Sequence, residues 1–387
     1  MTTATPFTVL IANPSPDVYG SDLQMLESVS AMTARGWRVI VAIPSDGELV
    51  GRLRERGAEI EFFPFPVLRR ANASLRAFLG LVGSAVAAVP RIMQLLRRLR
   101  PSAVYVNTVT LPWWLLAARL SGTPSVCHLH EAENQDRALV RRALMLPLRL
   151  ATAVIVISRS ALTTMTDSDP TLAAKAHLVY NGVPEPSVEP APPDRRDPFH
   201  LIVVGRLSPR KAPHLALEAV GRLRELSYPV VLELAGTAFE GYEWYVDELR
   251  TRAAQPDLEG AVTFSGYCSP IWPALERSDI VVAPSLREPF GNAVVEAQLA
   301  LRPVVATAAL GHLESITDHE TGLLVPAEDV EAMVKALAQL IEDDQLAESL
   351  ALTAQREARL RFSTERYNRE ITELVAQLVA RRGRVRA

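Results

Sequence analysis

Two stretches of the chain each alternate short apolar runs with helical patterns, and a proline-dense segment separates them. Such alternation is typical of βαβ units built around a parallel sheet. Because proline has no amide donor and stiffens the backbone, residues 184–198 are predicted to link two domains. The expected domains span 1–183 and 199–363, and the helical segment 364–387 is expected to pack back on the first domain. The predicted fold class is α/β, with two Rossmann-like domains.

The apolar runs are the expected strands. In the first domain they are residues 7–12, 37–43, 60–63, 103–106, 126–129 and 154–157, and in the second they are 201–204, 230–234, 262–264, 280–283 and 304–306. Open parallel sheets bind ligands at the carboxyl ends of their strands. The loops that follow these runs are therefore where a site is expected.

The composition is that of an ordinary globular protein. Of the 387 residues, 48% are hydrophobic and 22% are charged, and the net charge is -3. A balance this close to neutral gives no sign of a nucleic-acid partner. The two cysteines lie in different domains, which argues against a disulfide framework. No signal-like segment opens the chain, and its longest apolar run is shorter than the about 20 residues that span a bilayer. We expect a cytoplasmic protein.

The most informative motif is EPFGNAVVE, residues 288–296, which follows an apolar strand and opens a helix. Gly291 permits close approach of the backbone, and the amides of residues 291–293 would form an anion-binding helix start. Glu288 on the loop and Glu296 two turns into the helix can face one cleft and accept hydrogen bonds from hydroxyl groups. The alternative is that both are ordinary surface carboxylates.

A second motif, VGRLSPRK at residues 204–211, also follows a predicted strand. Arg206 offers a planar fork suited to phosphate, and Lys211 offers a compact point charge. The chain has only three lysines among 41 basic residues, so a lysine at this position favours a specific role. The alternative is a solvated loop.

Together the two motifs resemble the family-4 retaining glycosyltransferases of the GT-B fold, and the likeness extends over nearly the whole chain. The resemblance implies two facing Rossmann-like domains with a cleft between them. In that family a Glu-x7-Glu motif closes the sugar-nucleotide pocket, and Glu288 and Glu296 match it. The resemblance implies that Glu288 contacts hydroxyls of the donor sugar and Glu296 those of the ribose. It implies that Arg206 and Lys211 hold the diphosphate. Further donor contacts are implied at Gly20, Ser21, Gly205, Gly266, Tyr267, Phe290, Gly291, Asn292 and Ala293.

The same resemblance implies a UDP- or GDP-linked sugar as the donor and no separate cofactor. A departing nucleoside diphosphate gains negative charge, which preorganised cations stabilise. Two side-chain cations and a helix start can do this without a metal ion. The Asp-x-Asp pattern occurs only at residues 167–169, on a polar loop of the first domain. We therefore predict metal-independent transfer.

In the first domain, Gly20 and Ser21 precede a helix and resemble the family's Gly-Gly turn, which faces the donor phosphate. Ser21 stands in place of the second glycine. The alternative is a turn that serves only the start of the helix. Asn107, at the end of its strand, and Glu131 are candidates for contact with the acceptor.

The strand 126–129 leads directly into His130. Because side chains alternate along a strand, His128 and His130 point to the same side. The resemblance implies that His130 contacts the donor sugar and helps to orient the acceptor, whereas His128 is interpreted as a hydrogen-bonded interior residue. A zinc pair is the alternative, but no further cluster of Cys or His supports it. The candidate catalytic residues are His130, Arg206, Lys211 and Glu288.

Residues 62–130 contain no acidic side chain but several arginines, most of them within 69–100. We interpret the stretch 69–100 as a peripheral contact with the inner face of an anionic membrane that carries a lipid-linked acceptor. The alternative is an arginine-rich helical surface with no partner.

The resulting functional hypothesis is a retaining, hexosyltransferase-type glycosyltransferase that acts on a sugar- or lipid-linked acceptor in the synthesis of polysaccharide, glycolipid or glycoside. Double displacement would need a carboxylate nucleophile, and none can be nominated, so same-face attack is favoured. The alternatives are a nucleotide-sugar epimerase of the same fold and a non-catalytic protein that binds sugar nucleotides. The donor, the acceptor and the linkage stay open.

Overall fold

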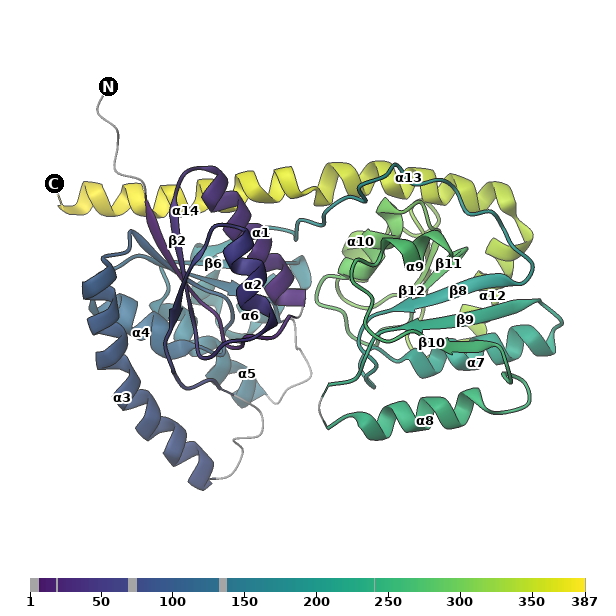
Figure 1. The fold of residues 1–387 in the computed structure, drawn as a ribbon, viewed down its shortest axis with the longest axis horizontal. Coiled ribbons are helices and arrows are strands. Elements are labelled where there is room, and N and C mark those ends of the chain that lie inside the picture. Colours follow the sequence, from purple (N-terminus) through teal and green to yellow (C-terminus); the bar gives the residue numbers. More distant parts are fainter. Residues whose placement is uncertain (1–6, 19, 69–74, 132–137, 240, 387) are drawn as a thin grey trace. The chain divides into compact units, whose positions relative to one another are not determined.

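The computed structural model describes residues 7–18, 20–68, 75–131, 138–239 and 241–386 (Figure 1). The chain forms two compact units, each built around one parallel sheet. The first comprises residues 1–182 together with 364–387, and the second comprises residues 183–363. The C-terminal helix therefore belongs to the same unit as the N-terminal strand.

The first unit has a seven-stranded parallel sheet in the order β3-β2-β1-β4-β5-β6-β7. Its strands are β1 Thr8–Ala12, β2 Arg38–Ile43, β3 Glu59–Phe62, β4 Ala103–Val106, β5 Ser125–Leu129, β6 Ala153–Val156 and β7 Ala176–Leu178. Its α-helices are α1 Gly20–Ala34, α2 Glu48–Glu55, α3 Leu75–Leu99, α4 Pro112–Leu120, α5 Ala138–Met145, α6 Arg159–Ser168 and α14 Thr364–Arg386. Short 3-10 turns cover Leu146–Leu150 and Pro170–Lys175.

The second unit has a six-stranded parallel sheet in the order β10-β9-β8-β11-β12-β13. Its strands are β8 Phe199–Val204, β9 Val230–Ala235, β10 Val262–Phe264, β11 Ile280–Ala283, β12 Val304–Thr307 and β13 Leu323–Val325. Its helices are α7 Pro213–Glu225, α8 Glu243–Ala253, α9 Trp272–Glu276, α10 Asn292–Leu299, α11 His312–Ser315, α12 Val330–Glu342 and α13 Asp344–Phe362.

The strands form where the apolar runs predicted them, because strands covered by helices on both faces bury nearly every side chain. The segment TVLIA of β1, for example, buries all but its first residue. The predicted α/β class with two Rossmann-like sheets is confirmed. The strands β7 and β13 were not predicted from the sequence, because each is only three residues long, lies at a sheet edge and has no pattern long enough to detect.

The core of the first unit includes α14. Its buried face consists of Tyr367, Ile371, Leu374, Val375 and Leu378, spaced as on one side of a helix. These side chains share a cluster with residues of β1, β2 and α1. The last helix thus supplies part of the hydrophobic interior on which the first sheet rests.

Each sheet reverses its strand order once, between β1 and β4 in the first unit and between β8 and β11 in the second. At such a reversal the two neighbouring loops leave in opposite directions, which opens a crevice at the carboxyl ends of the strands.

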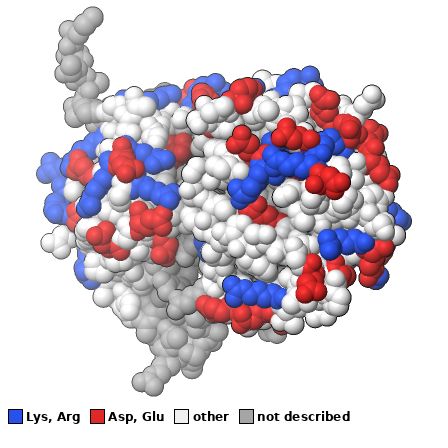
Figure 2. Space-filling view, turned by 45° about the vertical axis from the view of Figure 1, so that its right-hand side comes forward, with Lys and Arg blue, Asp and Glu red and all other residues white. Residues whose placement is uncertain are grey.

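On the face drawn in Figure 2, the coloured basic and acidic side chains are interspersed rather than gathered by sign.

Candidate functional site

Both sequence motifs of the second unit reach its strand-order reversal. The loop after β8 carries Arg206 and Lys211, and the loop after β11 carries Glu288. Because β8 and β11 are neighbours in the sheet, their carboxyl ends bring the two loops to the same edge.

Lys211 and Glu288 form an ion pair at this edge, with the Lys211 ammonium donating to Glu288 Oε2. Both side chains are largely buried, at 19% and 10% exposure. Ser285 Oγ donates to the same carboxylate oxygen at 3.2 Å. Burial is the largest single effect on the Glu288 carboxyl and raises its pKa. The charge and hydrogen bond of Lys211, together with contributions from His312 and Arg210, outweigh it, so the net direction is downward. The structure brings together a cation and a carboxylate that lie 77 residues apart in the chain.

Arg206 leaves the same strand end, and its guanidinium stacks on the ring of Phe239, 3.8 Å from the centroid. Phe239 lies in the loop after β9 and is 37% exposed. This stacking restrains an otherwise flexible arginine. Phe239 was missed by the sequence analysis, because a single loop aromatic has no distinguishing pattern.

Two glycines let the turns after β8 and β9 touch. Gly205 has a φ of 140°, a conformation that side chains rarely adopt. A Cβ atom at Gly236 would lie 1.7 Å from the carbonyl oxygen of Gly205. The turn Ala235–Gly236–Thr237 therefore needs glycine at its centre, and its contact with Gly205 sets the course of the backbone that leads into Arg206.

The substitution Gly236→Ala should destabilise the protein by about 1–3 kcal/mol, as overpacking does elsewhere, because the backbone at Gly205 has to move. Urea denaturation measures the change. Gly51→Ala is the matched control, since Gly51 lies in α2 with no atom near the added methyl group, and alanine favours a helix. An unchanged midpoint for Gly236→Ala would contradict the close contact.

The turn before α10 is held by buried contacts. Gly291 has a φ of 104°, and α10 begins at the next residue, Asn292. The Phe290 ring is buried against Phe362, with centroids 5.4 Å apart. The Phe290 side chain is therefore not available to a ligand, whereas Asn292 and Ala293 are partly exposed at the helix start. Amides at a helix start favour a bound anion.

Glu296 lies along α10 and is half-buried. Burial raises the pKa of its carboxyl to about 7, although the Lys211 charge opposes the shift. The pKa of the neighbouring Glu288 carboxyl is lowered instead, because Glu288 has a direct cationic partner. The two glutamates of the motif thus differ in charge state near neutral pH.

His312 is a further buried residue at this edge that the sequence analysis missed. Its Nδ1 donates to the carbonyl oxygen of Thr307 at 2.9 Å, and its ring lies 3.1 Å from the position of a Cβ at Gly291. Burial lowers the pKa of His312, so the imidazole is neutral at pH 7. A lone histidine after a strand offered no sequence signal.

Gly266 and Tyr267 follow β10, the edge strand on the far side of β9. Gly266 has a φ of 70°, and the Tyr267 side chain is exposed. The structure places this turn at the carboxyl edge of the same sheet, separated from the Lys211–Glu288 pair by the end of β9.

In the first unit, Asn107 and His130 meet at the carboxyl ends of β4 and β5, with His130 Nε2 3.0 Å from Asn107 Oδ1. Asn107 is buried, and its Nδ2 donates to Asn13 Oδ1 at 2.8 Å. Asn13 in turn donates to Asp22 Oδ1 at 2.8 Å. Asn13 and Asp22 were not predicted as site residues, because neither lies in a recognisable motif.

His128 and His130 lie on the same side of their strand, with ring centroids 4.0 Å apart. The interpretation of His128 as an interior residue is confirmed, since it is fully buried and its Nδ1 is hydrogen-bonded to the Tyr105 hydroxyl. Burial lowers the pKa of His130 to about 3, so His130 is neutral at physiological pH.

Glu131 binds the backbone next to the histidine ring. Its Oε2 accepts from the His130 amide at 3.0 Å, and its Oε1 accepts from the Thr108 hydroxyl at 2.9 Å. Burial raises the pKa of this carboxyl.

Gly20 and Ser21 form the first residues of α1, so Ser21 lies inside the helix rather than before it. A Cβ at Gly20 would meet no neighbour, so packing does not require glycine there.

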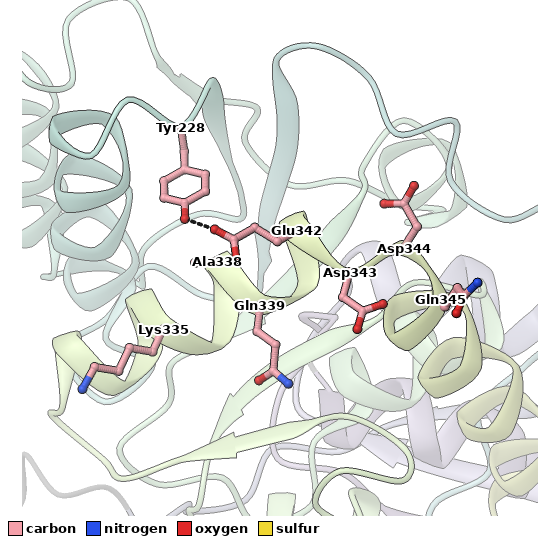
Figure 3. A pocket seen from close by; sticks show the side chains of 8 residues that line it. All are labelled: Tyr228, Lys335, Ala338, Gln339, Glu342, Asp343, Asp344 and Gln345. Atoms are coloured by element: carbon pink, nitrogen blue, oxygen red, sulfur yellow. Dashed lines mark hydrogen bonds between the residues drawn. The ribbon is translucent and has the colours of Figure 1, made fainter.

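Two further features lie outside these clusters. Within the described ranges, no group of three or more His, Cys, Asp or Glu side chains is arranged to hold a metal ion. Figure 3 shows a surface pocket where the Tyr228 hydroxyl donates to Glu342. Tyr228 lies two residues before the start of β9, so this pocket lies at the amino edge of the sheet, opposite the Lys211–Glu288 pair. Its lining residues are Tyr228, Lys335, Ala338, Gln339, Glu342, Asp343, Asp344 and Gln345.

Two Rossmann-like parallel sheets of this strand order, each with a polar cluster at its reversal, are what the GT-B class of two-domain proteins contains, and structural neighbours of that class share the fold. The crystal structure of Anabaena Alr3699/HepE in complex with UDP-glucose has this fold, with a TM-score of 0.82 and 24% identity, over 96% of this chain and 99% of that chain. Residues 20–185 match the model described as Glycosyltransferase Family 4, and residues 189–357 match Glycosyl transferases group 1. Because these two matches together cover most of the chain, the protein is a glycosyltransferase of the family-4 type.

Two glycosyltransferases align with about half of the chain. The lipopolysaccharide core biosynthesis glycosyltransferase LpsE of Rhizobium meliloti is 32% identical over 180 residues, which are 46% of this chain and 49% of LpsE. The D-inositol 3-phosphate glycosyltransferase of Corynebacterium urealyticum is 34% identical over 183 residues, which are 45% of this chain and 42% of that protein. The chain thus spans about half the length of these relatives. The family expected from the two motifs is confirmed.

Proposed function

We propose that the protein transfers a sugar, with retention of anomeric configuration, from a nucleotide-diphosphate sugar to a sugar- or lipid-linked acceptor. The observation that carries this proposal is the buried Lys211–Glu288 pair beside the start of α10, at the strand-order reversal of the second unit. Here a cation and the helix amides can bind a diphosphate, while a carboxylate remains to bind hydroxyl groups.

Lys211 and Arg206 are proposed to hold the diphosphate, Glu288 the hydroxyls of the donor sugar, and Glu296 those of the ribose. The leaving diphosphate gains charge as the glycosidic bond breaks, and the preorganised Lys211 ammonium stabilises that charge. Because side chains and backbone amides supply this stabilisation, we propose transfer without a metal ion. In the proposed same-face mechanism, a leaving phosphate oxygen takes the proton of the attacking acceptor hydroxyl.

A UDP-linked sugar is the donor that we propose to test first. The support is the UDP-glucose bound in the Anabaena neighbour, which shares the fold. The relatives named for lipopolysaccharide core and inositol phosphate glycosylation support an acceptor in cell-surface polysaccharide or glycoside synthesis. We also propose that residues 184–198 form the linker between the domain of residues 1–183 and the domain of residues 199–363.

The function is tested with a panel of UDP- and GDP-sugars, first by thermal shift and then by product analysis. A true donor should raise the melting temperature, because it binds the folded state. NMR of the product should show the anomeric configuration of the donor. An inverted product would exclude the proposed mechanism, and conversion of the donor without any acceptor would indicate an epimerase instead.

Stability and donor binding should depend on pH in opposite senses because of Glu296. Its pKa of about 7 in the folded state lies above the ordinary value of 4.5. Between these values the folded state binds more protons than the unfolded state, so this contribution to stability decreases as pH rises. Ribose hydroxyls donate to a carboxylate, so affinity for the donor should increase through pH 7 and binding should release a proton below that pH.

Calorimetry of UDP-glucose binding at pH 6.5, in buffers of different ionisation enthalpy, measures the proton. The phosphates of this ligand do not titrate near pH 7, so a released proton comes from the protein. The variant Glu296→Gln should release fewer protons when it binds UDP-glucose. Its free energy of unfolding should lose the pH dependence assigned to Glu296. Proton uptake by the wild-type protein would contradict the ribose contact.

We also propose that α3 contacts an anionic membrane surface. Arg91, Arg97, Arg98 and Arg100 are exposed along its second half and just beyond it. Arg98 is already paired with Glu61 at 2.6 Å, so its charge is partly neutralised. The arginines at positions 69 and 70 lie outside the described residues. No helix within the described residues has the length and apolar character needed to cross a membrane.

Sedimentation with vesicles containing anionic lipid tests this contact. Binding at low salt that decreases with ionic strength is expected, because charge drives it. The variant Arg97→Gln should bind less, whereas Arg222→Gln, on the second unit, should bind as the wild type does. Failure to sediment at low salt would remove the proposed membrane contact and leave the transfer reaction untouched.

A further inference from the structure

Four polar side chains of the first unit form one continuous chain of hydrogen bonds. Asp22, Asn13 and Asn107 are each at most 3% exposed, and His130 ends the chain. Asn13 follows β1, Asn107 follows β4, and both lie at the strand-order reversal of the sheet. Buried amides of this kind are costly unless each polar atom has a matching partner.

The orientation of the Asn13 amide is set by two acceptors. Its Nδ2 lies 2.9 Å from the carbonyl oxygen of Ser15 and 2.8 Å from Asp22 Oδ1. A rotated amide would place an oxygen against both of these oxygens. Asn13 therefore presents its nitrogen to Ser15 and Asp22, and its Oδ1 faces Asn107.

That orientation passes to Asn107 and then to His130. Asn107 Nδ2 donates to Asn13 Oδ1 at 2.8 Å and to the carbonyl oxygen of Ser21 at 3.4 Å. The remaining atom, Asn107 Oδ1, can only accept, and it lies 3.0 Å from His130 Nε2. The Nε2 atom must therefore carry the proton of the neutral imidazole.

We propose that Asn13 and Asn107 are positioning residues that hold His130 as the Nε2–H tautomer and leave its Nδ1 as a hydrogen-bond acceptor for a substrate hydroxyl. The hydrogen-bond chain stands on the structure of the first unit alone, whereas the substrate contact rests on the proposed function. Asn107 is thereby assigned to the support of His130 rather than to the acceptor, because its amide is occupied by protein partners.

The tautomer can be read directly in the full, ligand-free chain. Protein labelled with ¹⁵N-histidine gives two-bond ¹H–¹⁵N correlations whose pattern shows which ring nitrogen carries the proton. The His130 pattern is the one lost in His130→Gln, among the seven histidines. We expect a protonated Nε2 and an unprotonated Nδ1 at pH 7. A proton on Nδ1 would mean that the chain runs the other way and would overturn the proposal.

The variant Asn13→Ala tests whether the chain sets the tautomer. Once Asn13 is removed, Asn107 can rotate, so His130 should show a mixture of both tautomers. Thr108→Val is the matched control, since Thr108 bonds Glu131 in the same region but lies outside the chain. It should keep the wild-type pattern. A single Nε2–H form in Asn13→Ala would exclude Asn13 from this role.

Activity is a separate readout. If the protein transfers sugar as proposed, Asn13→Ala should lower kcat about 10-fold with little change in the KM for the donor, because one hydrogen bond in the transition state weakens. A protein with no transferase activity would overturn the proposed function but leave the tautomer result intact. If Asn13→Ala does not fold, the wild-type spectrum still decides the direction of the chain.

Discussion

Replacing Lys211 with methionine is expected to reduce kcat for sugar transfer by about 10²–10³-fold, which is the usual loss when one preorganised charge-stabilising group is removed. The methionine side chain has similar length and fills the same space without the charge. Lys211 is the cation paired with Glu288 at the strand-order reversal, so its loss removes the charge that we propose to stabilise the leaving diphosphate. Initial rates with the donor found in the nucleotide-sugar panel measure the effect.

The same substitution should also destabilise the second unit. It leaves Glu288 buried without its cation, and breaking one side of a buried pair costs about 3–5 kcal/mol when the remaining group stays charged. The pKa of Glu288 should then rise, since burial acts with less opposition. The double variant Lys211→Met/Glu288→Gln should recover stability but not activity.

Lys335→Met is the matched control for both effects. Lys335 is exposed on α12, at the amino edge of the same sheet, and the substitution removes the same charge from the chain. It should leave rate and stability nearly unchanged. If Lys211→Met kept the wild-type rate, the leaving group would not rest on Lys211, and the proposed donor site would be wrong.

Shortening Ile371 to alanine should destabilise the first unit by about 2–5 kcal/mol, the range for large-to-small substitutions in a core. Ile371 is fully buried on α14, within the cluster that contains β1 and α1. Hydrogen exchange measured by mass spectrometry localises the effect. Peptides from β1 should exchange faster than in the wild type, whereas peptides from β8, in the other unit, should change little.

Gln377→Ala serves as the control on the same helix, because Gln377 is exposed and alanine keeps the helical propensity. It should not accelerate exchange in β1. Equal acceleration in both units after Ile371→Ala would show that they unfold as one body and would contradict the division into two cores.

The packing of α14 in the first unit also explains why residue 182 is a glycine. A Cβ at Gly182 would lie 2.6 Å from Cβ of Tyr367. Tyr367 is buried, and its hydroxyl bonds Ser28 of α1 at 2.6 Å. The backbone at Gly182 therefore passes directly against the helix that closes the core, and sequence inspection had no way to anticipate this approach.

Much of the architecture follows from local sequence. Strands buried on both faces read as short continuous apolar runs, so their positions could be predicted without knowledge of their partners. Since parallel strands expose their carboxyl ends at one edge, the motifs after β8 and β11 were also expected to meet, as Lys211 and Glu288 do. The resemblance to a family identified the fold class through those same motifs.

Contacts that depend on distant residues could not be derived in this way. Asn13 and Asn107 are 94 residues apart, and neither carries a pattern that points to the other. Phe239 beneath Arg206 and His312 beside Gly291 are single residues that gain meaning only from their neighbours. The difference in pKa between Glu288 and Glu296 also arises from tertiary structure, because one carboxylate receives a buried cation and the other is mainly desolvated.

The amino-acid sequence by itself determined the parallel α/β class, all strand positions except those of β7 and β13, and the loops that carry charged motifs, because these depend on periodicity within one segment. Only the tertiary structure decided which side chains pair, which carboxylate is ionised and which nitrogen of His130 carries a proton. Hydrogen bonds and desolvation act over a few ångströms, and folding alone brings the groups concerned within that distance.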